Sequence, residues 1–328
     1  MQASSVPTTM TPQPSASTPS LSLSVVVLTY NRIESLRSLL ADLATLTYPG
    51  LEVVVVDNCS EVPAATLAEA YPKVVFLRSP GNIGTGGRNI GMAHAKGEIV
   101  ICLDDDVTGL TDEALWKMSS LFSERSVGAV CFKVIEAQTG RITNWVHHKP
   151  VEQYVNETFS TYEITEGAVA FRREVAAAAG FYPAHFFISH EGPDLAFRIM
   201  ELGYTVEYNP TVSVIHAYSP LARTSWRNYY YDTRNTIWLV ARNCPFFLFG
   251  ATLLTRQLGA MFIYSIRDGF LLWWLRGIRD GLRGLPQALR ERRKLTPATM
   301  RKIALIDRDR PNLLYLLRKR LFQRGIKI

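Results

Sequence analysis

The first half of the chain contains a series of apolar, β-rich segments that alternate with stretches of helical spacing. The apolar segments lie at residues 23–29, 51–57, 74–77, 98–103 and 127–135. Between them, residues 33–46 and 64–70 have the spacing of helices. Strands whose apolar residues are continuous, instead of alternating with polar ones, are covered on both faces of a sheet. This pattern predicts an α/β fold with a mainly parallel sheet and flanking crossover helices.

Composition places the chain among globular proteins and divides it into three parts. Its 328 residues are 47% hydrophobic and 20% charged, which excludes a disordered or collagen-like chain for most of its length. Residues 1–20 are almost entirely Ser, Thr, Pro, Ala and Gln, so we predict a disordered lead and no signal peptide. We expect the α/β domain at 21–220 and a helical, basic region at 221–328.

The four cysteines are far apart in the sequence and form no CxxC pair. Neither a disulfide framework nor a zinc cluster is therefore expected. A reducing, cytoplasmic setting fits this cysteine usage best.

Charge is distributed unevenly along the chain. From Arg234 to the C-terminus there are 20 basic and 5 acidic residues, a net charge of +15, whereas the preceding part carries −8. The basic region alternates with large apolar blocks and contains no motif that binds DNA or RNA, so no nucleic-acid partner is predicted.

The basic region also carries many aromatic residues interleaved with arginines. Its longest charge-free run, residues 243–255, has 13 residues, fewer than the roughly 20 that span a bilayer. We therefore predict helices that lie on an anionic membrane surface, supported by basic clusters at 290–294 and 318–320. The alternatives are packing on the α/β domain or a homodimer interface.

Polar residues follow three of the predicted strands. They are Thr29, Asn31 and Arg32 after the first strand, Asp57 and Asn58 after the second, and Asp104, Asp105 and Asp106 after the fourth. In open parallel sheets, ligands bind outside the carboxyl ends of the strands. The alternative for single residues is a structural role, with Asp57 and Asn58 in a turn and Asp106 as the cap of a helix that begins near Thr111.

The three consecutive aspartates predict a metal site. Clustered carboxylates repel one another unless a cation or solvent relieves the repulsion. Mg²⁺ and Mn²⁺ commonly bind through one or two carboxylates together with substrate phosphates. Asp106 would then bind the ion, while Asp104 orients a ribose or a water on the ion. His216, which ends another apolar segment, could add a nitrogen ligand, although a single His after a strand is usually structural.

A glycine-rich segment at 81–91 precedes a helix that carries Arg88. It does not fit a GxGxxG dinucleotide loop, because Asn89 stands where the third glycine would be, and it lacks the Lys-Ser/Thr pair of a Walker A loop. Such a loop still lets the backbone approach a ligand, and a guanidinium pairs well with phosphate oxygens. Asn82, Gly86 and Arg88 are therefore candidate ligand-binding residues; a simple glycine-rich connection is the alternative.

Glu191 and Asp194 lie at the start of a predicted helix. Pro193 is a favoured first helical residue, and Gly203 is placed to end the helix. The helix dipole stabilises acids at this position whether or not they take part in chemistry, and it should lower their pKa. A carboxylate at the rim of a pocket can also accept a proton from an attacking hydroxyl. Both residues are candidate catalytic bases.

Five motifs in this order resemble one enzyme family. They are Val-Val-Val-Leu-Thr-Tyr-Asn-Arg at 25–32, Val-Val-Asp-Asn at 55–58, Gly-Asn-Ile-Gly-Thr-Gly-Gly-Arg-Asn at 81–89, Leu-Asp-Asp-Asp at 103–106 and Glu-x-x-Asp-Leu-x-x-Arg at 191–198. The sequence resembles the family 2 glycosyltransferases of GT-A fold, especially the bacterial rhamnosyltransferase-like branch, over about residues 22–218. The resemblance implies a nucleotide-sugar donor at the strand ends, a Mg²⁺ or Mn²⁺ ion on its diphosphate, and a carboxylate that activates an acceptor hydroxyl for inversion at the anomeric carbon.

The resemblance also implies roles for individual residues. The donor would be bound by Thr29, Asn31, Arg32, Asp57, Asn82, Gly86, Arg88, Asp104 and Asp105, with Asp57 on the base. The metal would be held by Asp106 and His216. Independently of the resemblance, we expect the acceptor to meet Glu166, Gly167, His190 and Arg234, and Arg234 could clamp either an acceptor diphosphate or the departing nucleotide. The family often has Glu-Asp-x-Asp-Leu with the second residue as the base, whereas this sequence has Gly192 at that position. Glu191 is therefore the first candidate base and Asp194 the second.

The leading hypothesis is a metal-dependent inverting glycosyltransferase on the inner face of the cell membrane. It would move a sugar from a dTDP- or UDP-sugar to a polyprenyl-diphosphate-linked or glycan acceptor in cell-surface polysaccharide synthesis. One alternative is a sugar-phosphate nucleotidyltransferase, but the N-terminal glycine-rich Arg-Lys triphosphate loop of such an enzyme is absent. The other alternative is a noncatalytic basic membrane scaffold.

Overall fold

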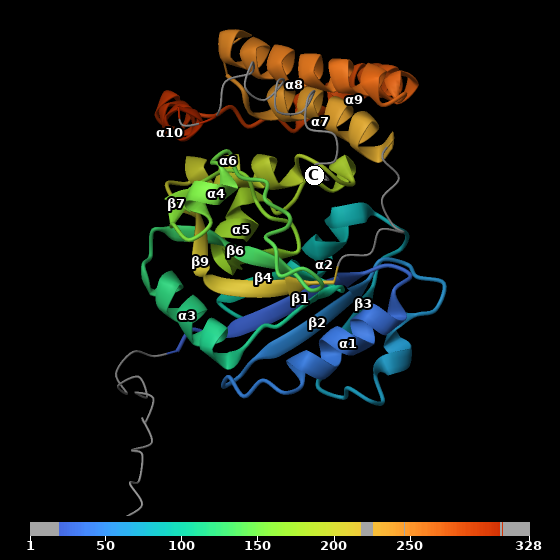
Figure 1. Cartoon of the computed structure of the whole chain (residues 1–328), viewed down its shortest axis with the longest axis vertical. Coiled ribbons are helices and arrows are strands. Elements are labelled where there is room, and N and C mark those ends of the chain that lie inside the picture. Colours follow the sequence, from blue (N-terminus) through green and yellow to red (C-terminus); the bar gives the residue numbers. More distant parts are fainter. Residues whose placement is uncertain (1–19, 218–225, 246, 309, 311–328) are drawn as a thin grey trace, which may run out of the picture.

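A single sheet forms the centre of the computed structural model, which describes residues 20–217, 226–245, 247–308 and 310 (Figure 1). Its strands are β1 (Leu23–Thr29), β2 (Glu52–Asp57), β3 (Val74–Arg78), β4 (Ile99–Asp104), β5 (Val107–Thr108), β6 (Val127–Glu136), β7 (Phe159–Ser160), β8 (Ala168–Arg172) and β9 (Thr205–His216). The basic cluster at 318–320, residues 1–19 of the lead and the domain boundary at 220/221 lie outside the described residues.

The strand order is β3-β2-β1-β4-β8-β6-β9-β5, and β7 pairs with β9. Strands β3, β2, β1 and β4 are parallel to one another, as the continuous apolar pattern predicts. Strand β8 runs antiparallel between β4 and β6 and joins this half to the parallel β6–β9 pair. Each predicted apolar segment forms a strand, and the predicted α/β fold class is confirmed.

Both faces of the sheet are buried, which explains the continuous apolar strands. Val25 and Val27 of β1 pack with the residues of α1 and α3 on one face, and Val26 packs with those of α2, α5 and α6 on the other. The helices around the sheet are α1 (Ile33–Leu43), α2 (Gly87–His94), α3 (Asp112–Ser123), α4 (Val151–Tyr154), α5 (Arg173–Ala179) and α6 (Glu191–Glu201). The two helical layers lie on opposite sides of the strands in Figure 1.

The C-terminal helices form a further layer on the α5–α6 side of the sheet (Figure 1). They are α7 (Trp226–Asn243), α8 (Phe247–Arg267), α9 (Leu271–Arg290) and α10 (Pro297–Asp307). Helix α9 packs closely on α7 because Gly281 has no side chain: a Cβ there would lie 2.6 Å from Ile237 Cδ1. Trp238 Nε1 also donates a hydrogen bond to the Gly281 carbonyl at 2.9 Å.

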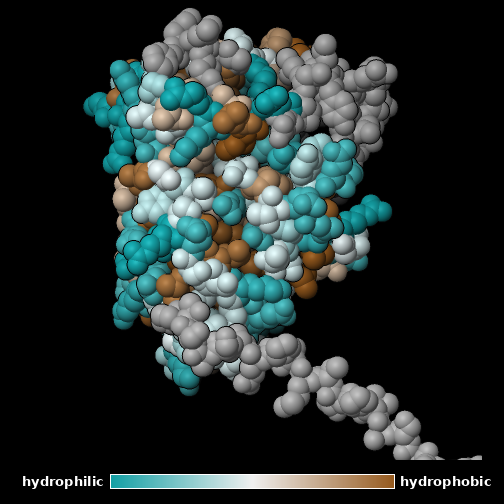
Figure 2. Space-filling model, turned by 90° about the vertical axis from the view of Figure 1, so that its left-hand side faces the viewer, coloured by the Kyte–Doolittle hydropathy of each residue, from teal (hydrophilic) through white to brown (hydrophobic). Residues whose placement is uncertain are grey.

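The predicted C-terminal helical region is therefore present. No helix within the described ranges combines the length and the apolar character that crossing a membrane requires. On the face shown in Figure 2, hydrophobic side chains lie among hydrophilic ones, both over the sheet domain and over the helices at the top.

Candidate functional site

The carboxyl edge of the sheet brings Thr29, Arg32, Asp105 and Asp106 together. Thr29 Oγ1 donates a hydrogen bond to Asp105 Oδ2 at 2.7 Å. Arg32 Nη1 contacts Asp105 Oδ1 at 2.9 Å and Asp106 Oδ2 at 2.5 Å. Burial raises the pKa of Asp105 to about 7, although Arg32 opposes the shift. The clustering expected from the strand ends is thus present in the fold.

His216 lies beside Asp106 because β5 pairs with the end of β9. Its Nε2 is 3.4 Å from Asp106 Oδ1. Burial alone would raise the pKa of Asp106, but His216 and Arg32 hold it below its usual value, so this carboxylate is ionised. Asp106 does not cap the following helix, since Thr111 Oγ1 accepts the hydrogen bond from the Ala114 N–H at 3.2 Å.

The Asp106–His216 pair fits a divalent cation. Asp106 Oδ1 is buried, and apart from the His216 imidazole it has no hydrogen-bond partner among the described residues. An ionised carboxylate oxygen next to an imidazole nitrogen is a suitable donor set for Mn²⁺ and also for Mg²⁺. Within the described part of the chain, no group of three or more His, Cys, Asp or Glu side chains could hold a metal ion. Two protein ligands suit an ion that completes its shell with substrate phosphates and water.

The glycine-rich loop is shaped by contacts with residues 184–187. It forms a short 3₁₀ helix, Gly84–Gly86, directly before α2. Gly84 has a φ of +61°, and the Thr85 N–H donates to the Phe187 carbonyl at 2.7 Å. A Cβ on Gly86 would lie 2.9 Å from Ala184 Cβ. The glycines therefore allow the loop to approach a distant segment, a contact that the motif alone does not reveal.

Asn58 ties the start of this loop to the end of β2. Its Nδ2 donates to Asn82 Oδ1 at 3.0 Å, and its Oδ1 accepts from the Ile83 N–H at 3.0 Å. Asn82 thus lies at the sheet edge, as predicted, and Asn58 holds it there.

Asp57 and Asn31 organise the two loops that follow β2 and β1. Asp57 accepts hydrogen bonds from the Ser60 N–H at 2.7 Å and from Arg78 Nη1 at 2.5 Å. Burial would raise the pKa of Asp57, but the hydrogen bonds from Ser60 and the charge of Arg78 lower it. Asn31, with a φ of +55°, accepts from the Glu61 N–H at 2.8 Å. Both side chains make turn contacts, and their contact with a nucleotide stays a prediction.

Arg88 is buried between two acidic side chains. Its Nη2 pairs with Asp104 Oδ1, and its Nη1 lies 3.8 Å from Glu166 Oε2. Arg88 Nε and Nη1 donate no hydrogen bonds to the described residues. Gly167, with a φ of +75°, packs so closely on Asp104 that a Cβ at position 167 would collide with the Asp104 carboxyl group. Arg88 therefore links Asp104 to the segment that carries Glu166 and Gly167.

Glu166 and Glu191 interact electrostatically next to Arg88. Burial, followed by the charge of Glu191, raises the pKa of Glu166 to about 8. Burial raises the pKa of Glu191 to about 7, although Arg88 opposes the shift. The expectation that the helix dipole lowers the pKa of Glu191 is wrong, because desolvation outweighs the dipole. Helix α6 begins at Glu191 itself, two residues before the expected start at Pro193.

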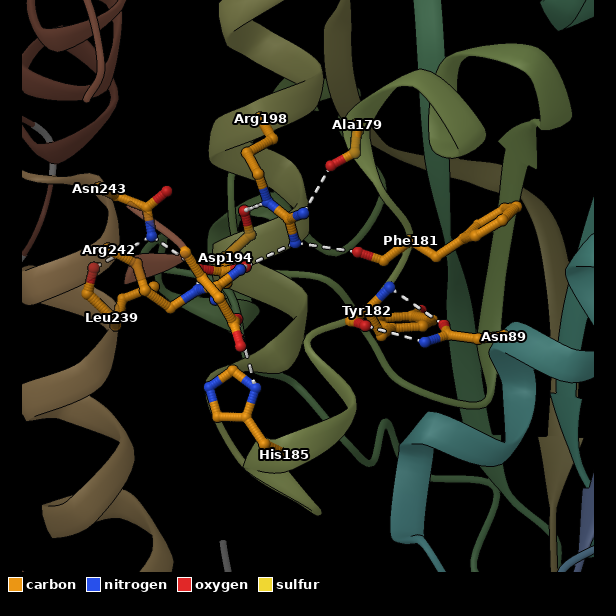
Figure 3. Close-up of polar contacts among 11 residues, drawn as sticks. Asn89, Ala179, Phe181, Tyr182, His185, Asp194, Arg198, Leu239, Arg242 and Asn243 are labelled. Carbon is orange, nitrogen blue, oxygen red and sulfur yellow. Dashed lines mark hydrogen bonds and ion pairs between the residues drawn. The ribbon is translucent and has the colours of Figure 1, made fainter. Parts of the chain in front are cut away.

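Asp194 is fully buried and joins α6 to α7 (Figure 3). Its Oδ2 accepts from Arg198 Nη2 at 2.5 Å, and its Oδ1 accepts from Arg242 Nε at 3.0 Å and from Asn243 Nδ2 at 2.6 Å. Burial would raise the pKa of Asp194, but the two arginines hold it below its usual value. A carboxylate held in this way is a poor proton acceptor. This environment therefore disfavours Asp194, the second of the two predicted bases.

His190 and Arg234 hold the segment before α6 against α7. The side chains of His190 and Thr236 meet at 3.0 Å, between Nε2 and Oγ1, and burial lowers the pKa of His190. Arg234 Nη2 donates to the Phe186 carbonyl at 2.6 Å, and its guanidinium lies 4.3 Å from the centre of a Trp238 ring. The predicted contact of these residues with an acceptor is not tested by this geometry and stays a prediction.

Two residues that shape the site, Asn89 and Arg242, were not among the candidates. Asn89 Nδ2 donates to the Tyr182 carbonyl at 2.8 Å, and its Oδ1 accepts from the Tyr182 N–H at 3.0 Å (Figure 3). This pair fixes α2 against the chain before α6. The sequence feature that could have identified Arg242 is its position inside an otherwise apolar stretch. Such a position predicts a buried arginine, and a buried arginine requires an acidic or polar partner. The identity of that partner, Asp194, depends on the fold.

Residues 24–180 match the family described as Glycosyl transferase family 2. The chain carries a family 2 glycosyltransferase domain. This confirms the family and the enzyme class expected from the motifs. The chain is 25% identical over 191 residues to the O-antigen chain rhamnosyltransferase WbaN of Salmonella anatum, a match that covers 55% of this chain and 60% of WbaN. The chain thus spans about 60% of the length of this relative.

Two solved structures share the fold. The mannosyltransferase PcManGT from Pyrobaculum calidifontis, in complex with GDP-Man and Mn²⁺, has a TM-score of 0.53 and 21% identity, over 93% of this chain and 80% of that one. S. aureus TarS 1–349, in complex with UDP-GlcNAc, has a TM-score of 0.58 and 19% identity, over 82% of this chain and 83% of that one. At these identities the likeness concerns the fold alone, and it agrees with the expected GT-A architecture.

Proposed function

We propose that this protein transfers a sugar from a nucleotide sugar to an acceptor hydroxyl during bacterial polysaccharide synthesis. The observation that carries the proposal is the grouping, at one edge of the sheet, of a glycine-rich loop, three successive aspartates, the buried Glu191 and the partly buried Glu166, both glutamates with raised pKa values. The family 2 domain supports the reaction class, and the name of WbaN, an O-antigen chain rhamnosyltransferase, supports the pathway class.

In this proposal the donor diphosphate lies over the aspartates that follow β4. Asp106 and His216 would hold a Mn²⁺ or Mg²⁺ ion, which would offset negative charge on the leaving diphosphate. The Arg32 side chain is 38% exposed, so it can leave Asp106 and pair with a phosphate oxygen when the donor binds. Arg88 forms an ion pair with Asp104 and thereby keeps the Asp104 carboxylate in a fixed orientation. A dTDP- or UDP-sugar is the proposed donor, and a polyprenyl-diphosphate-linked or glycan molecule the proposed acceptor.

A thermal-shift panel of UDP-, dTDP-, GDP- and CMP-sugars, with and without Mn²⁺, tests donor class and metal use together. A ligand at 100 times its Kd stabilises the folded state by about 2.7 kcal/mol, which is readily measured. We expect the stabilisation to require Mn²⁺ and to be lost in Asp106→Ala. The matched control is Asp42→Ala on the exposed side of α1. Normal turnover by Asp106→Ala would exclude the proposed metal role, and no response to any donor would contradict the function.

We further propose that α9 rests on the inner, anionic face of the cell membrane. One side of α9 presents exposed leucines on the face turned away from α7: Leu272, Leu275, Leu282 and Leu289. Arginines lie beside them at positions 276, 279, 283 and 290. We call this surface the leucine–arginine face. Apolar side chains flanked by arginines are typical of helices that insert shallowly among lipid headgroups.

Vesicle sedimentation tests the leucine–arginine face. Each half-exposed leucine contributes about 1 kcal/mol on insertion, so Leu275→Ser with Leu282→Ser should weaken binding to anionic vesicles ~30-fold. The control is Leu305→Ser, because Leu305 is exposed to a similar extent but belongs to α10. Unchanged sedimentation of the double variant would contradict the membrane proposal. Loss of dimers without loss of vesicle binding would indicate a homodimer surface instead.

A further inference from the structure

The Glu166 carboxyl group occupies the space in front of Gly192. A Cβ on Gly192 would lie 2.5 Å from Glu166 Oε1 and 3.0 Å from Ile164 Cβ. No side chain at position 192 can coexist with Glu166 in this conformation. Position 192 is also the place in the Glu-x-x-Asp-Leu motif where the family resemblance implies a carboxylate. The carboxyl group of Glu166 therefore occupies the space where the carboxylate expected at position 192 would lie.

The backbone places Glu166 next to the proposed donor site. The following residue, Gly167, accepts a hydrogen bond from the Asp104 N–H at 3.2 Å. Arg88 Nη1 lies 3.8 Å from Glu166 Oε2 and also belongs to the guanidinium that pairs with Asp104. Glu166 is thus held at a fixed position relative to the first aspartate of the Asp-x-Asp pair.

Both carboxyl oxygens of Glu166 are shielded from solvent, and apart from the Tyr182 hydroxyl and the more distant Arg88 guanidinium no described side chain engages them. The charged and titratable groups around this carboxyl come from several elements: Arg88 of α2, Cys102 and Asp104 of β4, Cys131 of β6, Glu191 of α6, and Tyr182. By contrast, a structural carboxylate in this chain, Asp194, has its oxygens filled by hydrogen bonds. A shielded acid whose oxygens are not filled by hydrogen bonds in this way is suited to accept a proton from a substrate.

We propose that Glu166 is the catalytic base that takes the proton of the acceptor hydroxyl, in the place left by Gly192. This rests on the proposed function. In the step, the acceptor oxygen forms a bond to the anomeric carbon, and the bond from that carbon to the diphosphate oxygen breaks, its electron pair leaving with the diphosphate. The hydroxyl proton moves to a Glu166 carboxyl oxygen and is released to solvent after product departure. Glu191 is a positioning residue whose negative charge makes Glu166 a stronger proton acceptor.

The energetic requirements of a base are met at this position. Efficient general bases have a pKa near the operating pH, and they contribute ~100- to 10,000-fold to the rate. Burial and Glu191 raise the pKa of Glu166 to about 8, while Arg88 opposes the shift and favours the ionised form. The carboxyl is therefore both a strong acceptor and still ionised in part near neutral pH.

The test uses the full-length protein and the steady-state release of nucleoside diphosphate from UDP-, dTDP- and GDP-sugars in the presence of Mn²⁺. We expect Glu166→Gln to lower kcat ~100- to 10,000-fold and to leave the donor KM within about threefold of wild type. The matched control is Glu163→Gln, a buried glutamate of the same segment whose carboxylate pairs with Arg310 at 2.7 Å. It should keep wild-type kcat.

A carboxylate exchange distinguishes a base from a structural role. The φ of Gly192 lies outside the left-handed region, so aspartate is allowed there once Glu166 is shortened and Ile164, whose Cβ would be 3.0 Å away, shifts by a few tenths of an ångström. The double variant Glu166→Ala with Gly192→Asp should have a kcat at least about tenfold higher than that of Glu166→Ala alone. Thermal unfolding verifies that each variant is folded.

Three results would overturn the inference. The first is a Glu166→Gln variant that keeps wild-type kcat. The second is a Glu191→Gln variant that loses more kcat than Glu166→Gln does, which would make Glu191 the base. The third is a folded exchange variant without any recovery, which would make Glu166 structural. Failure of the wild type to release nucleoside diphosphate from any donor would instead refute the proposed function, and the base assignment with it.

Discussion

The buried carboxylate of Asp194 should be essential for holding the C-terminal helices on the sheet domain. We consider Asp194→Asn, which keeps the shape of the side chain and removes its charge. Arg198 would then stay buried with its anionic partner gone, and Arg242 would keep only its ion pair with Glu291, whose side chain is 39% exposed (Figure 3). Both arginine side chains are only 7% exposed and Asp194 is 0% exposed, so solvent cannot compensate for the lost charge.

The expected magnitude follows from this burial. Removing one partner of a buried ion pair costs about 3–5 kcal/mol, because an uncompensated charge remains inside the protein. For a chain of this size each kcal/mol lowers Tm by about 2 °C, so Tm should fall by about 6–10 °C. Adding Arg242→Met removes one of the stranded charges, so the double variant should be more stable than the sum of the two single losses by about 0.5–3 kcal/mol.

Thermal and urea unfolding of the four proteins in this cycle measure the effect. Asp268→Asn is the control, because Asp268 forms an ion pair with Arg267 near the surface, and such pairs contribute about 0–1 kcal/mol. Asp194 should stabilise the fold above its unfolded pKa, and this contribution should disappear as the pH falls through its lowered folded pKa. Asp194→Asn should therefore lose less stability in acid than the wild type does.

Two outcomes would refute this reasoning. If the free energy of unfolding of Asp194→Asn is within about 1 kcal/mol of the wild-type value, Asp194 does not form a buried ion pair of the kind described with Arg198 and Arg242. If the variant stays folded at the assay temperature and loses turnover with unchanged donor KM, Asp194 acts in the chemistry and not only in the packing.

Three further predictions concern other parts of the fold. Glu166 has a folded pKa of about 8 against a usual value of 4.5. Its contribution to the free energy of unfolding should therefore be full below about pH 4.5 and lost as the pH rises through 8. Urea unfolding across this range should show a smaller decline in the free energy of unfolding for Glu166→Gln than for the wild type. Gly281→Val should cost about 1–3 kcal/mol in thermal unfolding, since its side chain would overlap Ile237, and an unchanged Tm would contradict the close packing of α7 on α9. Gly84→Ala should cost more than the about 1–2 kcal/mol of its left-handed φ of +61°, because a Cβ there would also collide with the Phe187 carbonyl group, and it should weaken donor binding; donor-induced thermal shifts equal to wild type would show that the loop is not part of the site.

Local features of the fold could be predicted because their causes lie within a few neighbouring residues. The continuous apolar run 23–29 predicts a strand buried on both faces, and β1 is that strand. The polar residues after β4 were expected at a ligand-binding edge, and Asp105 and Asp106 do meet Thr29 and Arg32 there. Strand β8 was not predicted, because its short run of small residues carries no period that distinguishes a strand from the helix that follows.

Assigning roles within the site depended on contacts between distant segments. The sequence places Glu191 and Asp194 in one helical turn, and the dipole argument treats them alike. In the structure, Asp194 meets Arg242 of α7 and is held ionised, whereas Glu191 faces Glu166 and has a raised pKa. Desolvation and pairing act over a few ångströms in space, and these neighbours come from remote parts of the chain.

The sequence by itself determined strands β1 to β4 and β6, the polar residues at their carboxyl ends and the family of the domain, because apolar periodicity and strand-end chemistry depend on consecutive residues. Only the tertiary structure decided that Asp194 is a structural ion and that Glu166 fills the space in front of Gly192. The physical reason is that burial and charge pairing depend on which elements the sheet and the C-terminal helices press together.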